Sequence, residues 1–430
     1  MKIYSIVLAA GQGVRMKSKT PKVLHQVAGI PMISHVLARL AELEVDRTIV
    51  VVGNGVGEVR AKLGEQVEYV EQDKQLGTAH ALLQAKALLN DIDGATLVIC
   101  GDTPLITSES LRELVQQHLK QAAAATILTA SVQEPTGYGR IIHDVVGEVS
   151  RIVEEADATA EERKIKEINS GVYCFDNRLL FAGLAEVKNE NSKGEYYLTD
   201  IISILRGKGK KVVAYQTCNV REILGVNDRV ALARANRIMR WKINREHLLN
   251  GVTLLDPLNT YIDANVQIRR DTTIYPGSYI SAGTIIGEDC SIGPHAYIRP
   301  GSVIGDRVKI GDFVEIKNST IGNDTKIPHH AYIGDSDLGK SINIGSGTIT
   351  VNYDGCKKSR VEIGDGAFIG CNTNLIAPVK IGNGAYIAAG STITNDVEAD
   401  AFAIARVKQE NKAGYAKKLK EKHGGKENVE

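Results

Sequence analysis

The chain has 430 residues, and its 52 Lys and Arg residues almost balance its 51 Asp and Glu residues, so the formal net charge is +1. This length predicts two domains of roughly 200 residues each, and the balanced charge argues against nucleic acid as a partner. No stretch reaches the ~18 apolar residues of a membrane-spanning helix, so we expect no membrane partner either. The six cysteines are scattered and form no CxxC pair, which favours reduced thiols and a cytoplasmic location.

Apolar runs typical of buried strands alternate with segments of helical spacing up to about residue 225. Strands are predicted at residues 5–10, 47–52, 95–100 and 125–130, and helices are predicted between them, for example at residues 79–89. Continuous apolar strands separated by helices predict an α/β, Rossmann-like domain with a parallel sheet covered on both faces. In such a sheet, ligands bind beyond the carboxyl ends of the strands.

A glycine-rich segment, Gly11-Gln12-Gly13-Val14-Arg15, follows the first predicted strand, and Lys22 comes shortly after it. Glycines let backbone N–H groups approach a phosphate chain, and Arg15 and Lys22 supply positive charge where phosphates would lie. The spacing matches neither the Walker phosphate loop nor the dinucleotide fingerprint. A phosphate site is therefore one interpretation, and a plain strand–helix connection is the other.

Two polar positions could supply metal ligands. Asp102 directly follows the predicted strand at residues 95–100, so its carboxylate is well placed to hold Mg²⁺, although it could also be a turn residue. Asn227 and Asp228 open a helical pattern that continues to residue 250, and either could be the N-cap of that helix. In combination with Asp102, we interpret Asn227 as a second metal ligand.

The second half of the chain contains a repeat of six residues. Aliphatic residues recur at this spacing in four runs, at residues 262–316, 321–333, 338–344 and 363–393. A unit of one short strand and one turn predicts a hexapeptide-repeat β-solenoid whose aliphatic residues fill the core. The repeat breaks at residues 350–361, which predicts a loop that leaves the solenoid.

Polar residues in this half gather where the regular pattern lapses. Arg299, Lys317 and Lys358 together suit the phosphate group of a sugar phosphate. His329 and His330 could be ordinary solvated residues, but beside these cations one of them is a candidate for the base that an attacking amine needs.

Motifs with specific spacing extend along nearly the whole chain. In chain order they are Leu8-Ala9-Ala10-Gly11, Pro21-Lys22-Val23-Leu24-His25, Gly77-Thr78-Ala79-His80-Ala81, Gly101-Asp102-Thr103-Pro104-Leu105, Tyr138-Gly139-Arg140, Asn169-Ser170-Gly171, Tyr197-Leu198-Thr199-Asp200 and Gly225-Val226-Asn227-Asp228. Together with the hexapeptide half, they resemble the bacterial family of bifunctional N-acetylglucosamine-1-phosphate uridylyltransferase / glucosamine-1-phosphate N-acetyltransferase enzymes.

The resemblance implies four regions. They are an α/β Rossmann-like nucleotidyltransferase domain at residues 1–227, a linker helix at 228–251, a left-handed parallel β-helix with the acetyltransferase at 252–406, and a Lys-rich tail at 407–430. The polar composition of the tail predicts that it is flexible.

In the first half, the resemblance also implies a role for each matching residue. The implied roles are uridine binding by Leu8, Ala9, Ala10, Gly11, Gln72, Gly77 and Thr78; stabilisation of the triphosphate in catalysis by Arg15 and Lys22; Mg²⁺ binding by Asp102 and Asn227; and N-acetylglucosamine binding by Gly139, Glu154, Asn169 and Thr199. One departure is Val14, where the family usually has Thr, so a hydroxyl near the phosphates is missing.

In the second half, the resemblance assigns the catalytic base to His329 and the acid that orients it to Glu315. The implied contacts are with the sugar phosphate at Arg299, Lys317, Tyr332, Asn343 and Lys358, with the acetyl group at Asn352 and Tyr353, and with coenzyme A at Ala389 and Arg406. Cys371 stands where the family typically has a Ser near the acetyl carbonyl, and a thiol is a weaker hydrogen-bond donor than a hydroxyl.

The implied function is synthesis of UDP-N-acetylglucosamine, a precursor of peptidoglycan and lipopolysaccharide. Acetyl-CoA would acetylate glucosamine 1-phosphate, and UTP with Mg²⁺ would then donate the uridylyl group and release pyrophosphate. The resemblance further implies small-molecule substrates and a homotrimer. One alternative is a monofunctional sugar-1-phosphate nucleotidyltransferase whose β-helix is only a trimerisation scaffold. The cysteine at position 371 favours this alternative, and the presence of His329 argues against it. Another is a non-catalytic nucleotide-sugar sensor, against which Lys22, Asp102 and Asn227 argue.

Overall fold

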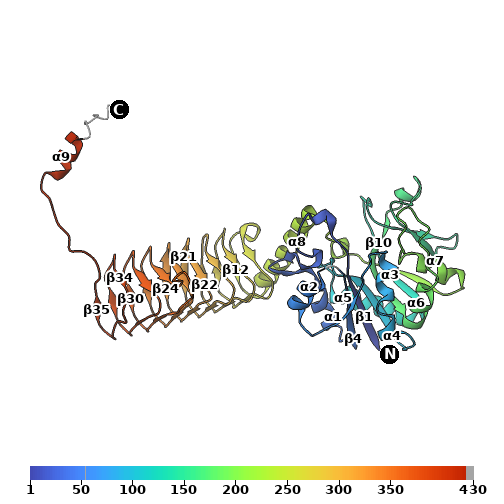
Figure 1. Cartoon of the computed structure of the whole chain (residues 1–430), viewed down its shortest axis with the longest axis horizontal. Coiled ribbons are helices and arrows are strands. Elements are labelled where there is room, and N and C mark those ends of the chain that lie inside the picture. Colours follow the sequence, from blue (N-terminus) through green and yellow to red (C-terminus); the bar gives the residue numbers. More distant parts are fainter. Residues whose placement is uncertain (54, 423–430) are drawn as a thin grey trace. The chain divides into compact units, whose positions relative to one another are not determined.

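The computed structural model describes residues 1–53 and 55–422, which divide into two compact units. The first unit contains Met1–Arg245 and Ile262–Ala264, and the second contains Glu246–Tyr261 and the chain from Asn265 onward. Figure 1 shows the course of the chain through both units. The last part of the predicted tail, residues 423–430, lies outside the described residues.

The first unit is built around one sheet with the strand order β11-β7-β10-β6-β1-β4-β5 (Figure 1). Its strands are β1 (Ile3–Ala9), β4 (Arg47–Val52), β5 (Glu68–Glu71), β6 (Ala95–Cys100), β7 (Ala125–Ser131), β10 (Glu167–Asp176) and β11 (Val212–Gln216), with the side hairpin β8 (Arg140–His143) and β9 (Val149–Val153). The sheet is mixed rather than purely parallel, because β10 runs antiparallel to both β6 and β7. The chain reaches β10 from the β8–β9 hairpin without the helical crossover that a parallel strand needs.

Helices cover both faces of this sheet. They are α1 (Met32–Ala41), α2 (Val56–Leu63), α3 (Thr78–Leu83), α4 (Lys86–Leu89), α5 (Ser108–Lys120), α6 (Asn177–Leu184) and α7 (Asp200–Gly207). The alternation of side chains along β1 divides the apolar core, because Ile6 packs in one cluster and Val7 in the other. The single helix expected at residues 79–89 is two short helices, α3 and α4.

The long helix expected from residue 228 is α8 (Arg229–Leu249). The Asp228 side chain caps it, because its Oδ1 atom accepts a hydrogen bond of 2.8 Å from the backbone N–H of Ala231. Ala235 and Met239 pack against Val27 in a third apolar cluster of the first unit. Short elements precede this helix in the chain: the pair β2 (Gln26–Val27) and β3 (Ile30–Pro31), and the 3₁₀ turns η1 (Val14–Met16), η2 (Lys22–Leu24), η3 (Glu162–Lys164) and η4 (Val220–Ile223).

The second unit is a left-handed parallel β-helix with three sheets, and each coil adds one strand to each sheet. Sheet 1 contains β12 (Thr253–Leu254), β15 (Thr273–Ile274), β18 (Ser291–Ile292), β21 (Lys309–Asp312), β24 (Lys326–His329), β27 (Asn343–Ile344), β30 (Phe368–Ile369), β33 (Tyr386–Ile387) and β35 (Phe402–Ala403). Sheet 2 contains β13 (Tyr261–Ile262), β16 (Tyr279–Ile280), β19 (Tyr297–Ile298), β22 (Glu315–Lys317), β25 (Tyr332–Gly334), β28 (Ile349–Val351), β31 (Asn374–Ile376) and β34 (Thr392–Ile393). Sheet 3 contains β14 (Gln267–Ile268), β17 (Ile285–Ile286), β20 (Val303–Ile304), β23 (Thr320–Ile321), β26 (Ser336–Leu338), β29 (Val361–Ile363) and β32 (Val379–Ile381), and the 3₁₀ turn η5 (Pro257–Asn259) lies near the first coil.

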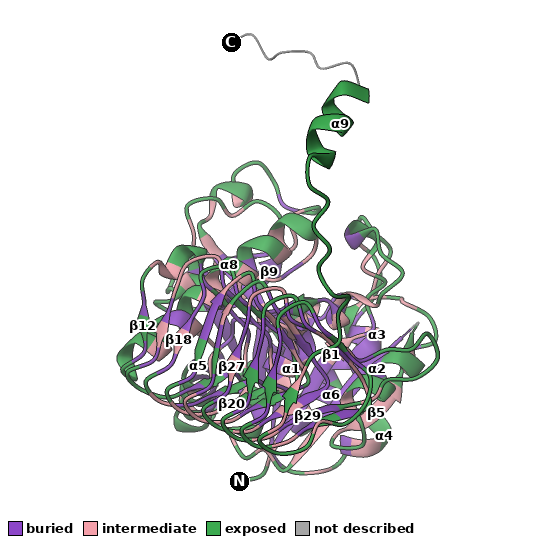
Figure 2. Ribbon diagram, turned by 90° about the vertical axis from the view of Figure 1, so that its left-hand side faces the viewer, coloured by how far each residue is buried: buried purple, intermediate pink, exposed green. Residues whose placement is uncertain are grey.

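The repeated aliphatic residues fill the core of the β-helix, as predicted (Figure 2). Ile286 pairs with Ile304, and Ile304 pairs with Ile321, so the second of these coils is one residue shorter. Leu338 pairs with Ile363, so this coil is lengthened by the loop that leaves after β28. Slips in the six-residue spacing are therefore absorbed in the turns, and the aliphatic ladder stays in register.

The final described segment after β35 contains α9 (Tyr415–Lys422), whose residues are all exposed. Within residues 1–53 and 55–422, none of the helices combines the length and the apolar character needed to cross a membrane.

Candidate active sites

A cavity of about 420 Å³ lies at the carboxyl ends of β1 and β6. Its position follows from the parallel pairing of these two strands, which brings the loops after both strands to the same edge of the sheet. The residues with predicted roles that line it are Leu8, Ala9, Ala10, Gly11, Lys22, Gln72, Gly77, Thr78 and Asp102.

Two glycines shape this cavity in different ways. Gly77 has a φ of +116°, and a Cβ atom on it would lie 2.5 Å from the carbonyl oxygen of Tyr196, so only glycine fits there. A Cβ atom on Gly11 would meet nothing within 4 Å, so this residue faces open space. The backbone at Gly11 is therefore accessible to a ligand in the cavity.

Amide side chains extend the lining beyond the predicted residues. Gln72 is buried, and its Nε2 atom donates to the carbonyl oxygen of Gly77 at 3.1 Å, which holds the two sides of the cavity together. Gln75 donates to the Gln72 carbonyl at 3.2 Å, and Gln12 donates to the Gln75 side chain at 3.4 Å. Sequence reasoning missed Gln12 and Gln75, although their positions beside Gly11 and Gln72 were an available signal.

Cys100 and Glu195 also line the cavity and were also missed. Burial is the main cause that raises the pKa of the Cys100 thiol, to about 12. This raised pKa favours the neutral thiol at physiological pH.

Lys22, Asp102 and Asn227 converge beside the cavity. The Lys22 ammonium group forms an ion pair with the Asp102 carboxylate and lies 3.0 Å from Asn227 Oδ1. The backbone N–H of Val226 donates to the carbonyl oxygen of Asp102 at 2.9 Å, which fixes the chain at residue 227 beside Asp102. Since Asp228 caps α8, the Asn227 side chain is free of that role and contacts the cation instead.

Arg15 lies in the turn η1, next to Met16, which is buried and anchors the turn. The Arg15 side chain is exposed. Val14, beside it, is 76 % exposed, so its apolar side chain has no packing role in the turn.

The four predicted sugar-binding residues lie together. Thr199 Oγ1 donates to Glu154 Oε1 at 3.2 Å, and the backbone N–H of Asn169 donates to the carbonyl oxygen of Gly139 at 2.9 Å. A Cβ atom on Gly139 would lie 3.5 Å from the Glu154 carboxylate, so the two pairs are neighbours. Burial is the largest influence on the Glu154 carboxyl and raises its pKa, although the hydrogen bond from Thr199 opposes this effect.

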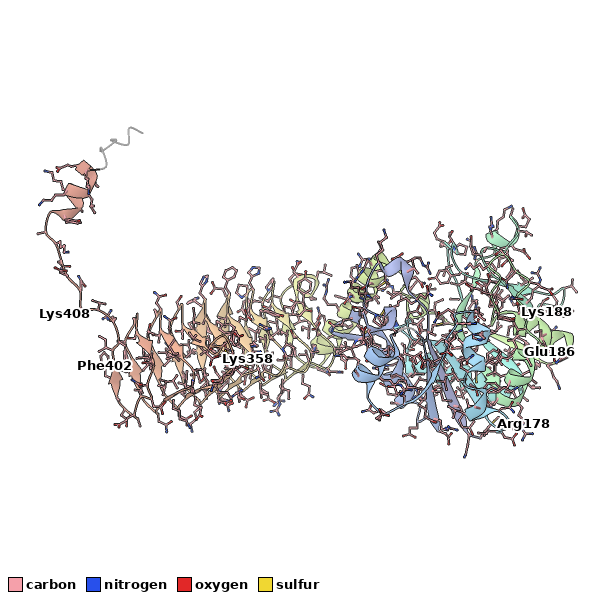
Figure 3. The ribbon with its side chains drawn as sticks, in the orientation of Figure 1. Arg178, Glu186, Lys188, Lys358, Phe402 and Lys408 are labelled. Atoms are coloured by element: carbon pink, nitrogen blue, oxygen red, sulfur yellow. The ribbon has the colours of Figure 1, made fainter. Side chains whose placement is uncertain are left out.

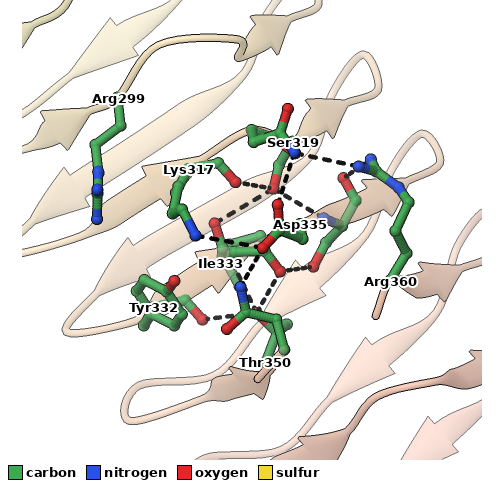
Figure 4. A network of polar contacts seen from close by, with 12 residues as sticks. Arg299, Lys317, Ser319, Tyr332, Ile333, Asp335, Thr350 and Arg360 are labelled. Carbon is green, nitrogen blue, oxygen red and sulfur yellow. Dashed lines mark hydrogen bonds and ion pairs between the residues drawn. The ribbon is translucent and has the colours of Figure 1, made fainter. Parts of the chain in front are cut away.

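Sheet 2 of the β-helix brings several predicted residues onto neighbouring coils (Figure 4). Arg299 follows β19, and its Nη1 atom donates to Glu315 Oε1 of β22 at 2.9 Å. Glu315 pairs in register with Tyr332 of β25. Lys317 of β22 forms an ion pair of 3.4 Å with Asp335, a buried residue that sequence reasoning missed.

His329 lies at the end of β24 in sheet 1, where its Nδ1 atom is 2.6 Å from Asp312 Oδ1 of β21. Within one chain, the acid beside the imidazole is therefore Asp312 rather than Glu315, and the role of Glu315 toward His329 stays a prediction. The reason is geometric: β21 precedes β24 in sheet 1 and ends at Asp312, whereas Glu315 begins β22 in sheet 2. The hydrogen bond with His329 is the largest cause that lowers the pKa of Asp312.

The loop at residues 352–360 carries three predicted residues. Asn352 is buried at its start, and Tyr353 and Lys358 form an isolated antiparallel bridge across it. Tyr353 is 55 % exposed, and Lys358 lies on the surface of the β-helix (Figure 3).

The remaining predicted residues lie away from sheet 2. Asn343 begins β27 in sheet 1, where it pairs with Phe368. Cys371 and Ala389 are exposed in the turns after β30 and β33, and Arg406 follows β35. Because β27 separates β24 from β30 in sheet 1, Cys371 and His329 are not on adjacent coils. Within one chain, the predicted residues of the β-helix therefore form separate groups rather than one pocket.

Three family models match the chain. A nucleotidyl transferase model matches residues 4–220, a model described as the GMPPB C-terminal domain matches residues 283–355, and the model for six bacterial transferase hexapeptide repeats matches residues 360–395.

Several curated proteins are similar over almost their whole length. The bifunctional protein GlmU of Geobacillus sp. (strain WCH70) is 52% identical, and the alignment covers 97% of this chain and 98% of that protein. The bifunctional protein GlmU of Geobacillus thermodenitrificans is 52% identical over 98% of this chain and 99% of its own length. The bifunctional protein GlmU of Brevibacillus brevis is 51% identical over 98% of both chains.

Proposed function

Since this chain belongs to the family of bifunctional GlmU proteins, we propose that it makes UDP-N-acetylglucosamine by two reactions at two sites. Acetyl-CoA acetylates glucosamine 1-phosphate, and UTP then donates its uridylyl group to N-acetylglucosamine 1-phosphate with release of pyrophosphate. The observation that carries this proposal is the 52% identity to a bifunctional relative over 97% of the chain, which includes both the nucleotidyl transferase and the hexapeptide regions. An alternative in which the β-helix is only a scaffold gains no support from such full-length similarity.

Uridylyl transfer takes place at the cavity beside β1 and β6. The backbone of residues 8–11 and the side chain of Gln72 bind the uridine, together with Gly77 and Thr78. The open space at Gly11 and the close packing of Gly77 support this role. The planar base needs backbone groups that it can reach at Gly11 and a rigid surface at Gly77 to pack against. The sugar phosphate binds at the neighbouring group formed by Gly139, Glu154, Asn169 and Thr199.

In this reaction, a phosphate oxygen of the sugar phosphate attacks the α-phosphorus of UTP and pyrophosphate leaves. Such a displacement depends on alignment and on neutralisation of charge more than on a base. Lys22 and the exposed Arg15 supply that charge at the triphosphate. The phosphate oxygen is already deprotonated and nucleophilic. The mechanism therefore needs no side chain of the cavity to act as a general base.

Asp102 and Asn227 are proposed to hold Mg²⁺. The fit is supported by the position of Lys22, because oxygen atoms of both side chains contact the same ammonium group and so already converge on one cation. One carboxylate and one amide oxygen, completed by phosphate oxygens and water, form the kind of ligand set that Mg²⁺ prefers. The bound ion would neutralise negative charge on the phosphates. Lys22 would then turn from Asp102 toward the triphosphate.

Acetyl transfer takes place on the β-helix, with His329 as the base. The free amine of glucosamine 1-phosphate attacks the carbonyl carbon of acetyl-CoA, and His329 accepts the proton that the nitrogen loses. The C–S bond then breaks, the imidazolium returns this proton to the sulfur, and coenzyme A leaves as the thiol. Asp312 holds the imidazole at Nδ1, so Nε2 is the nitrogen available to take that proton. The anionic Asp312 also stabilises the imidazolium that forms.

The other predicted residues bind the two substrates of this step. Arg299, Lys317 and Lys358 attract the phosphate, with Tyr332 and Asn343 as further contacts. Asn352 and Tyr353 bind near the acetyl group. Cys371 lies near the acetyl carbonyl, and Ala389 and Arg406 contact coenzyme A.

We further propose that the protein is a homotrimer. Hexapeptide β-helices and the similarity to GlmU proteins support an oligomer, and the separation of Lys317 from Cys371 within one chain supports sites completed by a neighbouring subunit. A cytoplasmic location is part of the proposal, because all six cysteines are free, as in a reducing compartment. The molar mass by light scattering tests the trimer, and a monomer would refute it.

The test of this function uses the purified protein with both substrate pairs. Thiol release from acetyl-CoA should require glucosamine 1-phosphate and should fall about 10²-fold or more in the His329→Ala variant. Pyrophosphate release from UTP should require N-acetylglucosamine 1-phosphate and Mg²⁺ and should be unchanged in the same variant. His330→Asn is the matched control, because Asn tolerates the left-handed backbone at that position. Absence of sugar-dependent thiol release from the folded wild type would refute the acetyltransferase.

A further inference from the structure

Asp335 is a buried carboxylate in an unfavourable backbone conformation. Only 6 % of the residue is exposed, and its φ of +48° lies in the left-handed region that non-glycine residues seldom adopt. Burial of a charged group also carries a cost unless the group is well paired. Because both the backbone conformation and the burial of the charge are unfavourable, the contacts around Asp335 must compensate for them and hold the side chain in place.

Three side chains from two other coils bind the Asp335 carboxylate (Figure 4). Asn318 donates to Oδ1 at 2.6 Å, Asn352 donates to Oδ2, and the Lys317 ammonium group lies 3.4 Å from Oδ2. Burial by itself raises the pKa of Asp335, but the hydrogen bonds from Asn318 and Asn352 and the charge of Lys317 outweigh it and lower the pKa. The carboxylate is therefore anionic at neutral pH and can hold all three donors at once.

The segment around Asp335 also anchors both ends of the loop at residues 352–360. At the start of the loop, Asn352 binds the Asp335 carboxylate, and at its end the backbone N–H of Val361 donates to the Asp335 carbonyl at 3.2 Å. Arg360 adds a bidentate ion pair with Asp337 and donates to the carbonyl oxygen of Ser336 at 3.2 Å. The loop is thus tied to one short segment of a neighbouring coil.

We infer that Asp335 is a positioning residue for acetyl transfer, which fixes Lys317 and Asn352 relative to each other and orders the loop before the sugar phosphate binds. The inference rests on the proposed acetyltransferase function. Asp335 itself is buried behind these two side chains, so it acts through them rather than by contact with the substrate. Pre-organised side chains lose less conformational freedom on binding, so the contribution appears as affinity for the sugar phosphate.

The test compares Asp335→Asn with a matched Asp→Asn variant in the full-length protein. Asparagine tolerates the left-handed backbone, but it removes the negative charge and directs an NH₂ group toward other donors. The control is Asp324→Asn, because Asp324 also has a positive φ of 62° and pairs with a cation, Arg307, but is only half-buried. In the described part of the chain, its hydrogen bonds and ion pairs involve none of the residues with predicted roles. Steady-state kinetics of acetyl transfer, uridylyl transfer by the same samples and thermal unfolding are measured for each protein.

We expect the KM for glucosamine 1-phosphate to rise about tenfold or more in Asp335→Asn. The KM for acetyl-CoA should rise by a smaller factor, because Asn352 lies near the acetyl group, while the uridylyl transfer rate stays within about twofold of the wild type. Asp324→Asn should match the wild type. On a Lys317→Met background, Asp335→Asn should add much less, because the two residues act together. Unchanged kinetics with glucosamine 1-phosphate in Asp335→Asn, or an equal loss in Asp324→Asn, would overturn the inference while the acetyltransferase stands. If the wild type neither acetylates nor binds glucosamine 1-phosphate, the proposed function fails and this inference fails with it.

Discussion

The side-chain nitrogen of Lys22 lies 3.0 Å from the Oδ1 atom of Asn227, although 205 positions separate the two residues in the chain. The contact joins the loop after β1 to the turn before α8, and Asp102 completes it from the loop after β6. Three distant segments therefore contribute one residue each to a single charged group beside the cavity.

Replacement of Asp102 by Asn should impair uridylyl transfer selectively. The variant keeps the size of the side chain but removes the only carboxylate among these three residues, so we expect the rate to fall about 10²-fold or more and the Mg²⁺ requirement to rise. Pyrophosphate release as a function of Mg²⁺ concentration measures both effects. The control is Asp93→Asn, which removes an exposed carboxylate from an ion pair with Arg178. An Asp102→Asn variant with the wild-type Mg²⁺ dependence would contradict the proposed metal ligand.

Gly77→Ala should destabilise the first unit. The new Cβ atom would lie 2.5 Å from the Tyr196 carbonyl oxygen at a φ of +116°, and such strain costs about 1–3 kcal/mol or more. The single Trp, Trp241 in α8, reports the denaturant unfolding of this unit by fluorescence. Gly57→Ala is the control, because Gly57 lies in α2 and a Cβ atom on it would meet open space, so Ala there should be neutral or stabilising. Equal midpoints for both variants would show that the backbone at Gly77 adapts.

His118 should make the stability of the first unit depend on pH. Burial is the main cause that lowers the pKa of His118, to about 4, and its Nδ1 atom contacts Thr126 Oγ1 at 3.1 Å. The folded protein therefore favours the neutral imidazole of His118. The contribution of this preference to the free energy of unfolding is fully present above pH ~6.5 and is lost as the pH falls toward ~4. The loss should reach at most about 3 kcal/mol.

The measurement for His118 is the free energy of unfolding, followed by Trp241 fluorescence, between pH 7 and pH 4.5. We expect a shallower pH dependence in His118→Gln, whose amide has no proton to gain but can still bind Thr126. Parallel curves for the two proteins would mean that other groups cause the pH dependence.

Cys371→Ser should increase the rate of acetyl transfer. A hydroxyl is a much stronger hydrogen-bond donor than a thiol, and donors to a developing oxyanion contribute up to about 10²-fold in other enzymes. Because Cys371 is exposed in a turn, the change should leave the melting temperature unaltered. Cys356→Ser, in the exposed loop, is the matched control and should change neither property. A slower or unchanged Cys371→Ser enzyme would show that the thiol is not at the acetyl carbonyl.

The local elements were predictable where one periodicity dominates. The strands at residues 47–52 and 95–100 coincide with β4 and β6, because each is a continuous apolar run buried on both faces. The break of the helix at residues 79–89 and the antiparallel direction of β10 were not predictable in the same way. Both depend on how neighbouring segments pack, which the spacing of apolar residues does not encode.

The pairing of side chains was predicted less well than the elements that carry them. Glu315 and Asp312 are both acidic residues close to His329 in the chain, but the corner of the coil directs them to different sheets. Asp335 follows a glycine in an ordinary repeat, and only the stacking of coils shows that it holds Lys317 and Asn352.

The sequence by itself determined the aliphatic core of the β-helix, the order of the two units and the chemical types at the nucleotide loop, because these depend on residues close together in the chain. Only the tertiary structure decided that Lys22, Asp102 and Asn227 meet, that Asp312 is the partner of His329, and that Asp335 connects three coils. Strand order and coil stacking bring these residues together, and both are set by the free energy of packing the whole chain rather than by any local pattern.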